Sequence, residues 1–311
     1  MSRESLRSWN RLFSQTPPEP RRRVRSAWVR LAAMTVLFLL VMVVAAGVRA
    51  AAGHTPVLSL LAGAAVAVGG IAVYAAVVRA MEQRAVTELD PATATSELGK
   101  GFLIGLGLFT ATIALISMFG GYSTAGGGSF GGMAAVLGLM AGVAVTEELL
   151  FRGVVFRLLE ELGGTTAALV VSAVLFGSIH LVNPGATVWG AVAIAVEAGL
   201  MLGAAYVATR NLWVPIGLHL AWNFASRGIY GATVSGDDAT PTGLVQGVFS
   251  GPAALTGGGF GPEASVFAIL VCAVPTVLFL RAAKRRDRLH TRRTTATTTS
   301  AAAVSGDAAG R

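Results

Sequence analysis

Three groups of polar side chains interrupt hydrophobic stretches of the sequence, and their spacing suits them to catalysis. In the first group, Glu147 and Glu148 are followed by Arg152. Glu148 and Arg152 are four residues apart, so on a helix they share a face, with the acid in the better orientation for an ion pair. Glu147 points about 100° away from Glu148. One carboxylate can therefore pair with the arginine while the other stays free for general-base chemistry.

Two histidines lie in the hydrophobic stretches that follow. His180 comes four residues after Phe176, and His219 precedes Asn223 by one helical turn. An imidazole and a carboxamide one turn apart can reach the same oxygen atom, so the pair could stabilise an oxyanion. The imidazole could also bind a metal ion. Hydrogen bonding between helices, worth about 0.6 kcal/mol per bond in membranes, is the structural alternative for each histidine.

The elements that must position these side chains are membrane helices. The 311 residues are 54% apolar and only 13% charged, with a mean hydropathy of +0.67. Soluble domains carry about 25% charged residues, so this composition excludes an ordinary soluble enzyme and predicts an integral protein of the lipid bilayer. The apolar runs are continuous rather than alternating, which favours helices over strands. The predicted fold is an all-α, polytopic membrane protein.

About eight stretches are long enough to cross a bilayer, which takes about 20 mostly apolar residues. They cover residues 27–49, 56–79, 101–121, 132–156, 164–183, 188–209, 211–229 and 264–282. Ionisable groups inside such stretches cost about 2.5–3.5 kcal/mol each on insertion scales, which makes each a functional candidate. Glu197 is a further acid of this kind, without a charged residue one turn away. It could line the same cavity or pair with a histidine, but a structural role is the stronger expectation. The pairs Gly101–Gly105, Gly138–Gly142 and Gly199–Gly203 have the spacing that lets helices approach closely.

The charge distribution predicts an orientation. There are 24 Lys and Arg against 16 Asp and Glu, a net charge of +8. With the N-terminus in the cytoplasm, only Arg49 and Arg227 among the basic residues fall outside, as the positive-inside rule requires. A multi-pass protein of the cell membrane with both termini cytoplasmic is therefore expected. Because orientation accounts for the basic charge, no nucleic-acid partner is expected.

The predicted organisation has a core, which carries the three polar groups, between accessory segments. The expected parts are a cytoplasmic basic tail (1–26), N-terminal transmembrane helices (27–129), the core (130–227), an extracytoplasmic loop (228–263), a last transmembrane helix (264–282) and a disordered basic tail (283–311). The single cysteine, Cys272, cannot form an internal disulfide or a Cys-based zinc site. The absence of an H-E-x-x-H motif excludes the common zincin pattern.

Three ordered motifs resemble those of a known family. The segments E-E-L-L-F-R (Glu147–Arg152), F-G-S-I-H (Phe176–His180) and H-L-A-W-N (His219–Asn223) are similar to the motifs of the CPBP intramembrane proteases. These are the CAAX prenyl protease and bacteriocin-processing family, also called Abi. The stretch R-N-L-W-V-P (Arg210–Pro215) is also similar to the family. The resemblance covers about residues 130–227, and no motif residue departs from the pattern.

The resemblance implies an endopeptidase that cleaves a membrane-associated protein or peptide within the membrane. It implies that Glu147 activates the attacking water together with His180. It further implies that His219 and Asn223 hold the scissile carbonyl oxygen as it becomes an oxyanion.

The resemblance also implies that Glu148 and Arg152 keep the site assembled. It leaves two questions open: whether a metal ion takes part, and whether the chain is a protease. The family is commonly filed as metalloproteases, so a zinc ion held by Glu147, His180 and His219 is one possibility, and a zinc-free glutamate mechanism is the other. Outside proteolysis, the same residues would suit a non-catalytic scaffold, a proton-coupled transporter or a bis-histidine haem protein.

Overall fold

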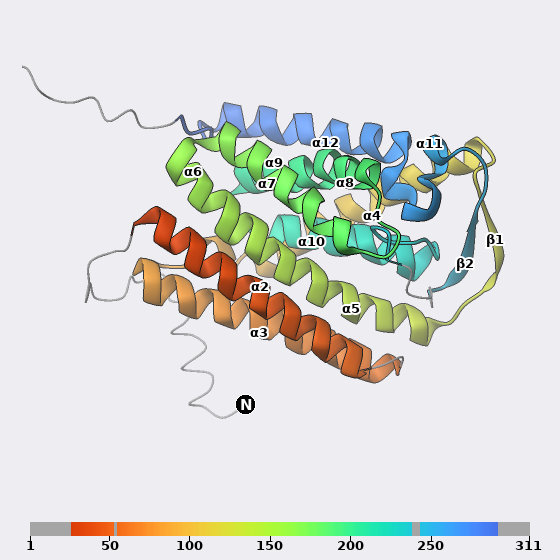
Figure 1. Cartoon of the computed structure of the whole chain (residues 1–311), viewed down its shortest axis with the longest axis horizontal. Coiled ribbons are helices and arrows are strands. Elements are labelled where there is room, and N and C mark those ends of the chain that lie inside the picture. The colour runs from red at the N-terminus through yellow and green to blue at the C-terminus, as the bar shows by residue number, and fades with distance from the viewer. Residues whose placement is uncertain (1–25, 53–54, 238–242, 292–311) are drawn as a thin grey trace, which may run out of the picture.

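The computed structural model of the chain describes residues 26–52, 55–237 and 243–291. Most of the two terminal tails expected from the sequence lies outside these described residues. Within them the chain folds into a bundle of helices, and seven are long and apolar enough to cross a membrane. The expected all-α, polytopic membrane fold is confirmed (Figure 1).

The described helices run in the following order. They are α2 (Ala27–Ala52), α3 (Pro56–Glu82), α4 (Ala94–Met118), α5 (Phe130–Glu148), α6 (Arg157–Gly163), α7 (Thr165–Ile179), α8 (Val188–Ile194), α9 (Leu200–Thr209), α10 (Trp213–Asn223), α11 (Ala253–Thr256) and α12 (Val266–Arg285). Three π-helical segments extend or join them: Leu149–Phe156 between α5 and α6, Ala195–Gly199 between α8 and α9, and Phe224–Ile229 after α10.

The number of spans differs from the eight expected because the stretch at 211–229 forms a shorter helix. It folds as the 11-residue α10 followed by a 6-residue π segment. Nearly every residue of α10 is buried, since α4, α5 and α9 pack around it. A helix enclosed by other helices is apolar partly because of protein burial, and the two segments together have 17 residues, fewer than the expected stretch. The segment Phe130–Gly163, by contrast, is longer than expected, with 34 residues.

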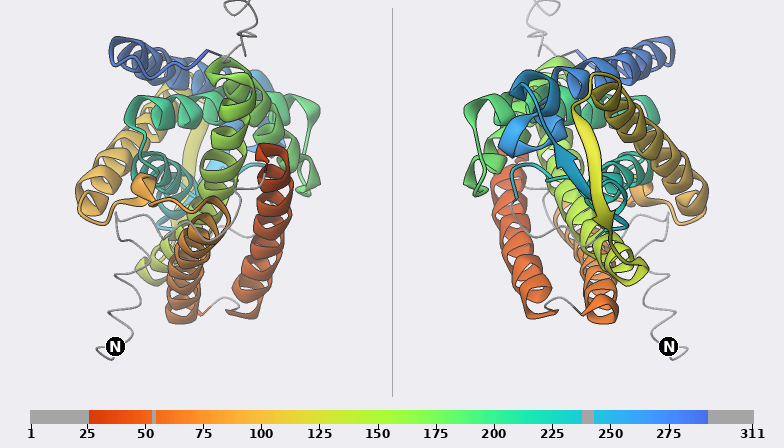
Figure 2. Two further views of the ribbon diagram at one scale, coloured as in Figure 1. Left: turned by 90° about the vertical axis from the view of Figure 1, so that its left-hand side faces the viewer. Right: turned by 90° about the vertical axis from the view of Figure 1, so that its right-hand side faces the viewer.

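Two short strands are present, although the apolar pattern favoured helices alone. The strands β1 (Tyr122–Gly127) and β2 (Val245–Phe249) pair antiparallel, with Tyr122 opposite Phe249 and a bulge between Thr124 and Gly126. They lie in the polar, glycine-rich connections at one end of the bundle, where no apolar run indicates a spanning segment (Figures 1 and 2). The second strand occupies part of the predicted loop 228–263.

Close helix contacts hold α10 in the centre of the bundle. Gly101 and Gly105 of α4 face the backbone of α10: a Cβ atom added at Gly101 would lie 2.1 Å from the carbonyl oxygen of Val214, and one at Gly105 would lie 2.2 Å from that of Leu218. The close approach predicted for this glycine pair is therefore confirmed. Gly138 of α5 contacts the backbone of α3 in the same way. Small residues thus set the positions of the two helices that carry Glu147 and His219.

Charged side chains form a belt at the end of the bundle where α2 begins and α3, α6, α9 and α12 end. This charged belt contains the ion pairs Arg30–Glu161, Arg84–Glu82, Arg84–Glu88, Arg157–Glu82 and Arg210–Glu160. Burial alone would raise the pKa of Glu88, but the hydrogen bonds and charge of Arg84 outweigh it and hold this pKa below its ordinary value. The belt is therefore a network of ionised groups at the ends of the membrane-spanning helices and in the connections between them.

Candidate active site

The sequence-predicted site residues meet in the interior of the bundle. Glu147 lies in the last turn of α5, and His180 directly follows α7. His219 and Asn223 lie on the central helix α10. A π-helical segment follows both Glu147 and Asn223, and such segments occur frequently at functional sites.

Arg152 is the cation at the base of the site. Its side chain is completely buried, and its Nη1 donates to Glu148 Oε1 at 2.7 Å, which is the ion pair expected from their spacing. Its Nη2 donates to the carbonyl oxygens of Ala198 and Gly199 at 3.3 and 3.2 Å, both in the π segment between α8 and α9. The guanidinium also lies 4.4 Å from the centre of the Phe176 ring, a cation–π contact. Arg152 therefore ties three helical segments together.

Glu148 links this arginine to His219. The Nδ1 atom of His219 lies 2.9 Å from Glu148 Oε1. Because an ionised carboxylate only accepts, we assign the proton to Nδ1. Nε2 then faces the Asn223 amide, which donates to it at 3.1 Å, and Glu147 Oε2 lies 3.9 Å away. Both the orientation and the tautomer of His219 thus depend on Glu148.

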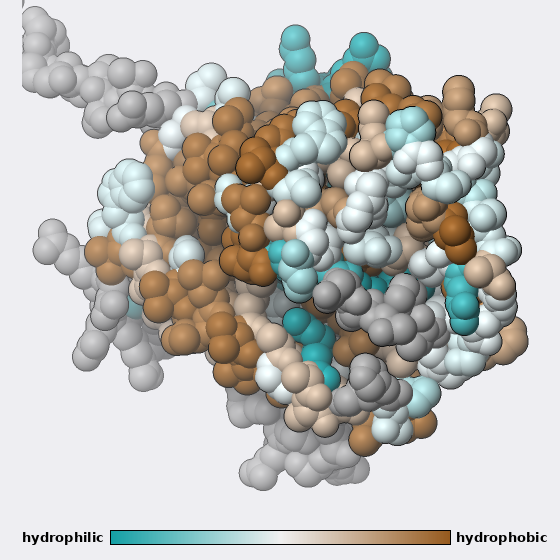
Figure 3. Space-filling view, turned by 45° about the vertical axis from the view of Figure 1, so that its right-hand side comes forward, coloured by the Kyte–Doolittle hydropathy of each residue, from teal (hydrophilic) through white to brown (hydrophobic). Residues whose placement is uncertain are grey.

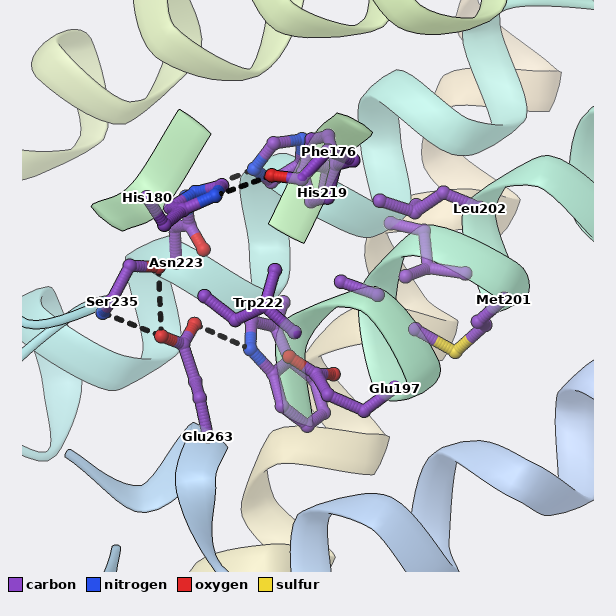
Figure 4. Close-up of a pocket in the computed structure, with 13 residues that line it drawn as sticks. Phe176, His180, Glu197, Met201, Leu202, His219, Trp222, Asn223, Ser235 and Glu263 are labelled. Carbon is purple, nitrogen blue, oxygen red and sulfur yellow. Dashed lines mark hydrogen bonds between the residues drawn. The ribbon is translucent and has the colours of Figure 1, made fainter. Parts of the chain in front are cut away.

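Glu147 faces a cavity and keeps an unsatisfied oxygen. The residue is 9% exposed, and its Oε2 has no hydrogen-bond partner among the described residues. The cavity has a volume of about 470 Å³, and its wall includes Glu147, His180 and Asn223. Nδ1 of His180 donates to the carbonyl oxygen of Phe176 at 2.7 Å (Figure 4). Its Nε2 therefore has a free lone pair, which suits His180 to accept a proton beside Glu147.

Several residues of this wall were not singled out from the sequence as site residues. Arg49 belongs to α2, which was predicted to be accessory. The others follow α7 or α10: they are Asn183, Arg227, Ser235 and Asp237. One feature of the sequence sets two of these residues apart: Arg49 and Arg227 are the two basic residues that the predicted topology places outside the cytoplasm.

Glu197 lines a second, smaller cavity, whose wall also includes His180, His219 and Asn223. This cavity, about 20 Å³ in volume, has room for about one water molecule. Glu197 Oε2 accepts from the Sγ of Cys272 at 3.5 Å, and its Oε1 has no partner within the described residues. Glu263 on the opposite wall accepts from Trp222 Nε1 at 2.9 Å and from the Ser235 hydroxyl at 2.8 Å, as Figure 4 shows. Glu263, from the predicted loop, thus anchors that loop onto α10.

The residues implied as zinc ligands do not form a ligand set. In the part of the chain that the structure describes, no three His, Cys, Asp or Glu side chains are grouped so that they could hold one metal ion. The Nε2 of His219 faces an amide donor, and Glu147 Oε2 lies 3.9 Å from it. These donors do not fit a tetrahedral zinc site, in which ligand distances are about 2.0–2.2 Å. No chemical step is therefore assigned to a metal.

The side-chain geometry leads to a prediction about metal removal. Dialysis of the purified protein against 1,10-phenanthroline and EDTA should change a hydrolysis rate by less than about two-fold, because the described side chains form no zinc ligand set and Glu147 offers a carboxylate that can act as general base. The rate is measured together with the zinc content by mass spectrometry. A loss of activity that added zinc restores would contradict this expectation.

The comparisons with known proteins agree with the motifs. Residues 129–225 match the family model described as Type II CAAX prenyl endopeptidase Rce1-like. The match covers the segment from the start of α5 to just past Asn223 and includes all the predicted site residues. No curated protein and no solved structure gives a significant match. The resemblance to the CPBP family is thereby confirmed.

Proposed function

Because residues 129–225 match the Rce1-like family model, we propose that this chain is an intramembrane endopeptidase in which Glu147 activates water. The family match supports endopeptidase activity within the membrane, and the apolar helices make a membrane-associated substrate the natural partner. The observation that carries the proposal is the position of Glu147, whose unpartnered oxygen borders a cavity shared with His180 and Asn223.

The proposed reaction begins with one water molecule held between Glu147 and His180. Glu147 takes a proton from the water as its oxygen attacks the scissile carbonyl carbon, and the carbonyl oxygen becomes an oxyanion. When the tetrahedral intermediate collapses, the C–N bond breaks and Glu147 returns the proton to the leaving amine. One water is consumed, and a new carboxyl group and a new amine are formed.

The oxyanion would be held by the pair on α10. Asn223 Nδ2 donates a hydrogen bond to His219 Nε2 at 3.1 Å. The carbonyl oxygen of a bound substrate can accept this hydrogen bond in place of Nε2. His219 can donate from Nε2 once that atom is protonated, and Glu148 on Nδ1 stabilises the resulting cation. Both side chains are held in position before the reaction, and such preorganisation makes an oxyanion site effective.

Removing the amide of Asn223 tests this assignment. We expect Asn223→Ala to lower kcat by about 10²–10³-fold, the usual effect of deleting one oxyanion donor. Asn223→Asp keeps the shape but replaces the donor with an acceptor, so it should be at least as inactive. Rates are measured on purified variants whose melting temperatures have been shown to equal that of the wild type. A wild-type rate for Asn223→Ala would rule out the oxyanion role.

The activity itself is tested by comparing cell membranes. Terminal-peptide proteomics is performed on membranes from cells that make the wild type or Glu147→Ala at matched levels. Peptide termini found only with the wild type would establish proteolysis and identify the substrate. Identical termini, with both proteins folded and abundant, would instead favour a non-catalytic scaffold or a proton-coupled transporter.

A further inference from the structure

The basic residues are distributed very unequally between the two ends of the bundle. Of the described lysines and arginines, Arg152 is buried in the interior, and only Arg49 and Arg227 lie toward the end that carries β1 and β2. All the others lie at or near the charged belt or on the last turns of α12 beside it. Lysine and arginine flanking membrane helices are retained on the cytoplasmic side. The charged belt therefore marks the cytoplasmic end.

The catalytic cavity occupies the opposite half of the bundle. The part of each helix that lines the cavity is the part that lies farther from the charged belt. On α2 this part runs from Leu39 to Arg49, whereas Arg30 of the same helix belongs to the belt. The wall is completed by residues 179–183 at the end of α7 and by residues 234–237 after α10.

The rim of the cavity combines exposed apolar side chains with charged groups. Val43 of α2 is 69% exposed, and Val182 is 86% exposed. Deeper polar groups include Arg227, whose Nη1 pairs with Asp237 Oδ2 at 3.1 Å. Figure 3 shows strongly hydrophilic side chains gathered in the middle of this face, between brown apolar surface and the paler end of the molecule. Such a rim suits a peptide that approaches partly from lipid and partly from water.

We propose that the catalytic cavity opens on the extracytoplasmic side, so that the substrate is a peptide segment presented from the outer leaflet or from outside the cell. The part concerning the substrate rests on the proposed function. A segment of this class is the extracytoplasmic end of a membrane-inserted helix or an exported peptide that associates with lipid. A prenylated C-terminal tail held on the cytoplasmic leaflet would meet the charged belt instead of the rim.

Cysteine labelling in intact cells tests which side the cavity faces. The only native thiol, Cys272, is fully buried, so the wild type provides a low background. Asp237→Cys reports on the rim, Ser250→Cys on the end that carries β2, and Lys100→Cys on the start of α4 near the charged belt. Val182→Cys gives a second rim reporter should Asp237→Cys fail to fold. Each full-length variant is treated with a membrane-impermeant maleimide before and after permeabilisation of the cells.

We expect the rim reporter and Ser250→Cys to be labelled in intact cells about ten-fold above the wild type, because exposed thiols react and buried ones do not. Lys100→Cys should be labelled only after permeabilisation. Labelling of Lys100→Cys in intact cells, or of the rim reporter only after permeabilisation, would overturn the proposal. Labelling requires no catalysis, so it reports the side of the cavity even if the proteomic comparison finds no cleavage.

Discussion

Replacing Arg152 with methionine is expected to lower the free energy of unfolding by about 3–5 kcal/mol and to abolish cleavage. Arg152 is fully buried and neutralises Glu148 at 2.7 Å. Its removal leaves a buried carboxylate without its cation, and the carbonyl oxygens of Ala198 and Gly199 lose a donor. Activity is lost as well, because the same carboxylate orients His219. The protein yield and the thermal midpoint in detergent measure the first effect, and the cleavage rate measures the second.

A double variant separates charge from packing in this prediction. In Glu148→Gln/Arg152→Met no buried charge is left unpaired, so most of the lost stability should return. Its activity should stay low, because a neutral amide in place of the Glu148 carboxylate cannot stabilise a protonated His219. We therefore expect restored melting with cleavage still reduced. Arg152→Met melting at the wild-type temperature would show that the ion pair does not support the fold.

The second large effect is expected at Glu147. Glu147→Gln should lower kcat by about 10³-fold, because an amide cannot take the proton from water, and general-base catalysis contributes about 10²–10⁴-fold. The melting temperature should not fall. Glu147 Oε2 has no hydrogen-bond partner among the described residues, so the substitution breaks no bond to that atom. Rates and melting curves of purified protein measure both effects.

Glu161→Gln is the matched control for this substitution. Its side chain is 50% exposed and pairs with Arg30 in the charged belt, far from the cavity. The same change of chemistry there should alter neither the rate nor the substrate preference. Cleavage by Glu147→Gln at the rate of this control would contradict the assigned role.

The helices could be predicted from the sequence because lipid requires long apolar segments with internally satisfied backbones. The same rule did not predict that α10 is shorter than the apolar stretch or that its buried residues pack against α4, α5 and α9. It also does not apply to β1 and β2, which lie in glycine-rich connections outside the apolar runs. Hydropathy measures how apolar the side chains of a segment are, and it does not distinguish a segment that faces lipid from one that faces a protein interior.

The candidate site was predictable where its contacts are local. Glu148 and Arg152 pair within one turn, and His219 contacts Asn223 within one turn. The link from Glu148 to His219 joins residues 71 positions apart, so only the packing of α5 against α10 reveals it. The place of Arg49 in the cavity wall likewise depends on how α2 packs beside the core. Periodicity within single helices carries no information on either contact.

Cleavage in isotopically labelled water tests whether Glu147 activates the water molecule that hydrolyses the peptide bond. The purified full-length protein is reconstituted in lipid vesicles with a peptide that spans a cleavage site found by proteomics, in water enriched in ¹⁸O. With the wild type, the new C-terminus should gain one ¹⁸O atom, and Glu147→Gln should give no product above background. Product formed by Glu147→Gln at the wild-type rate, or product without ¹⁸O, would contradict the mechanism.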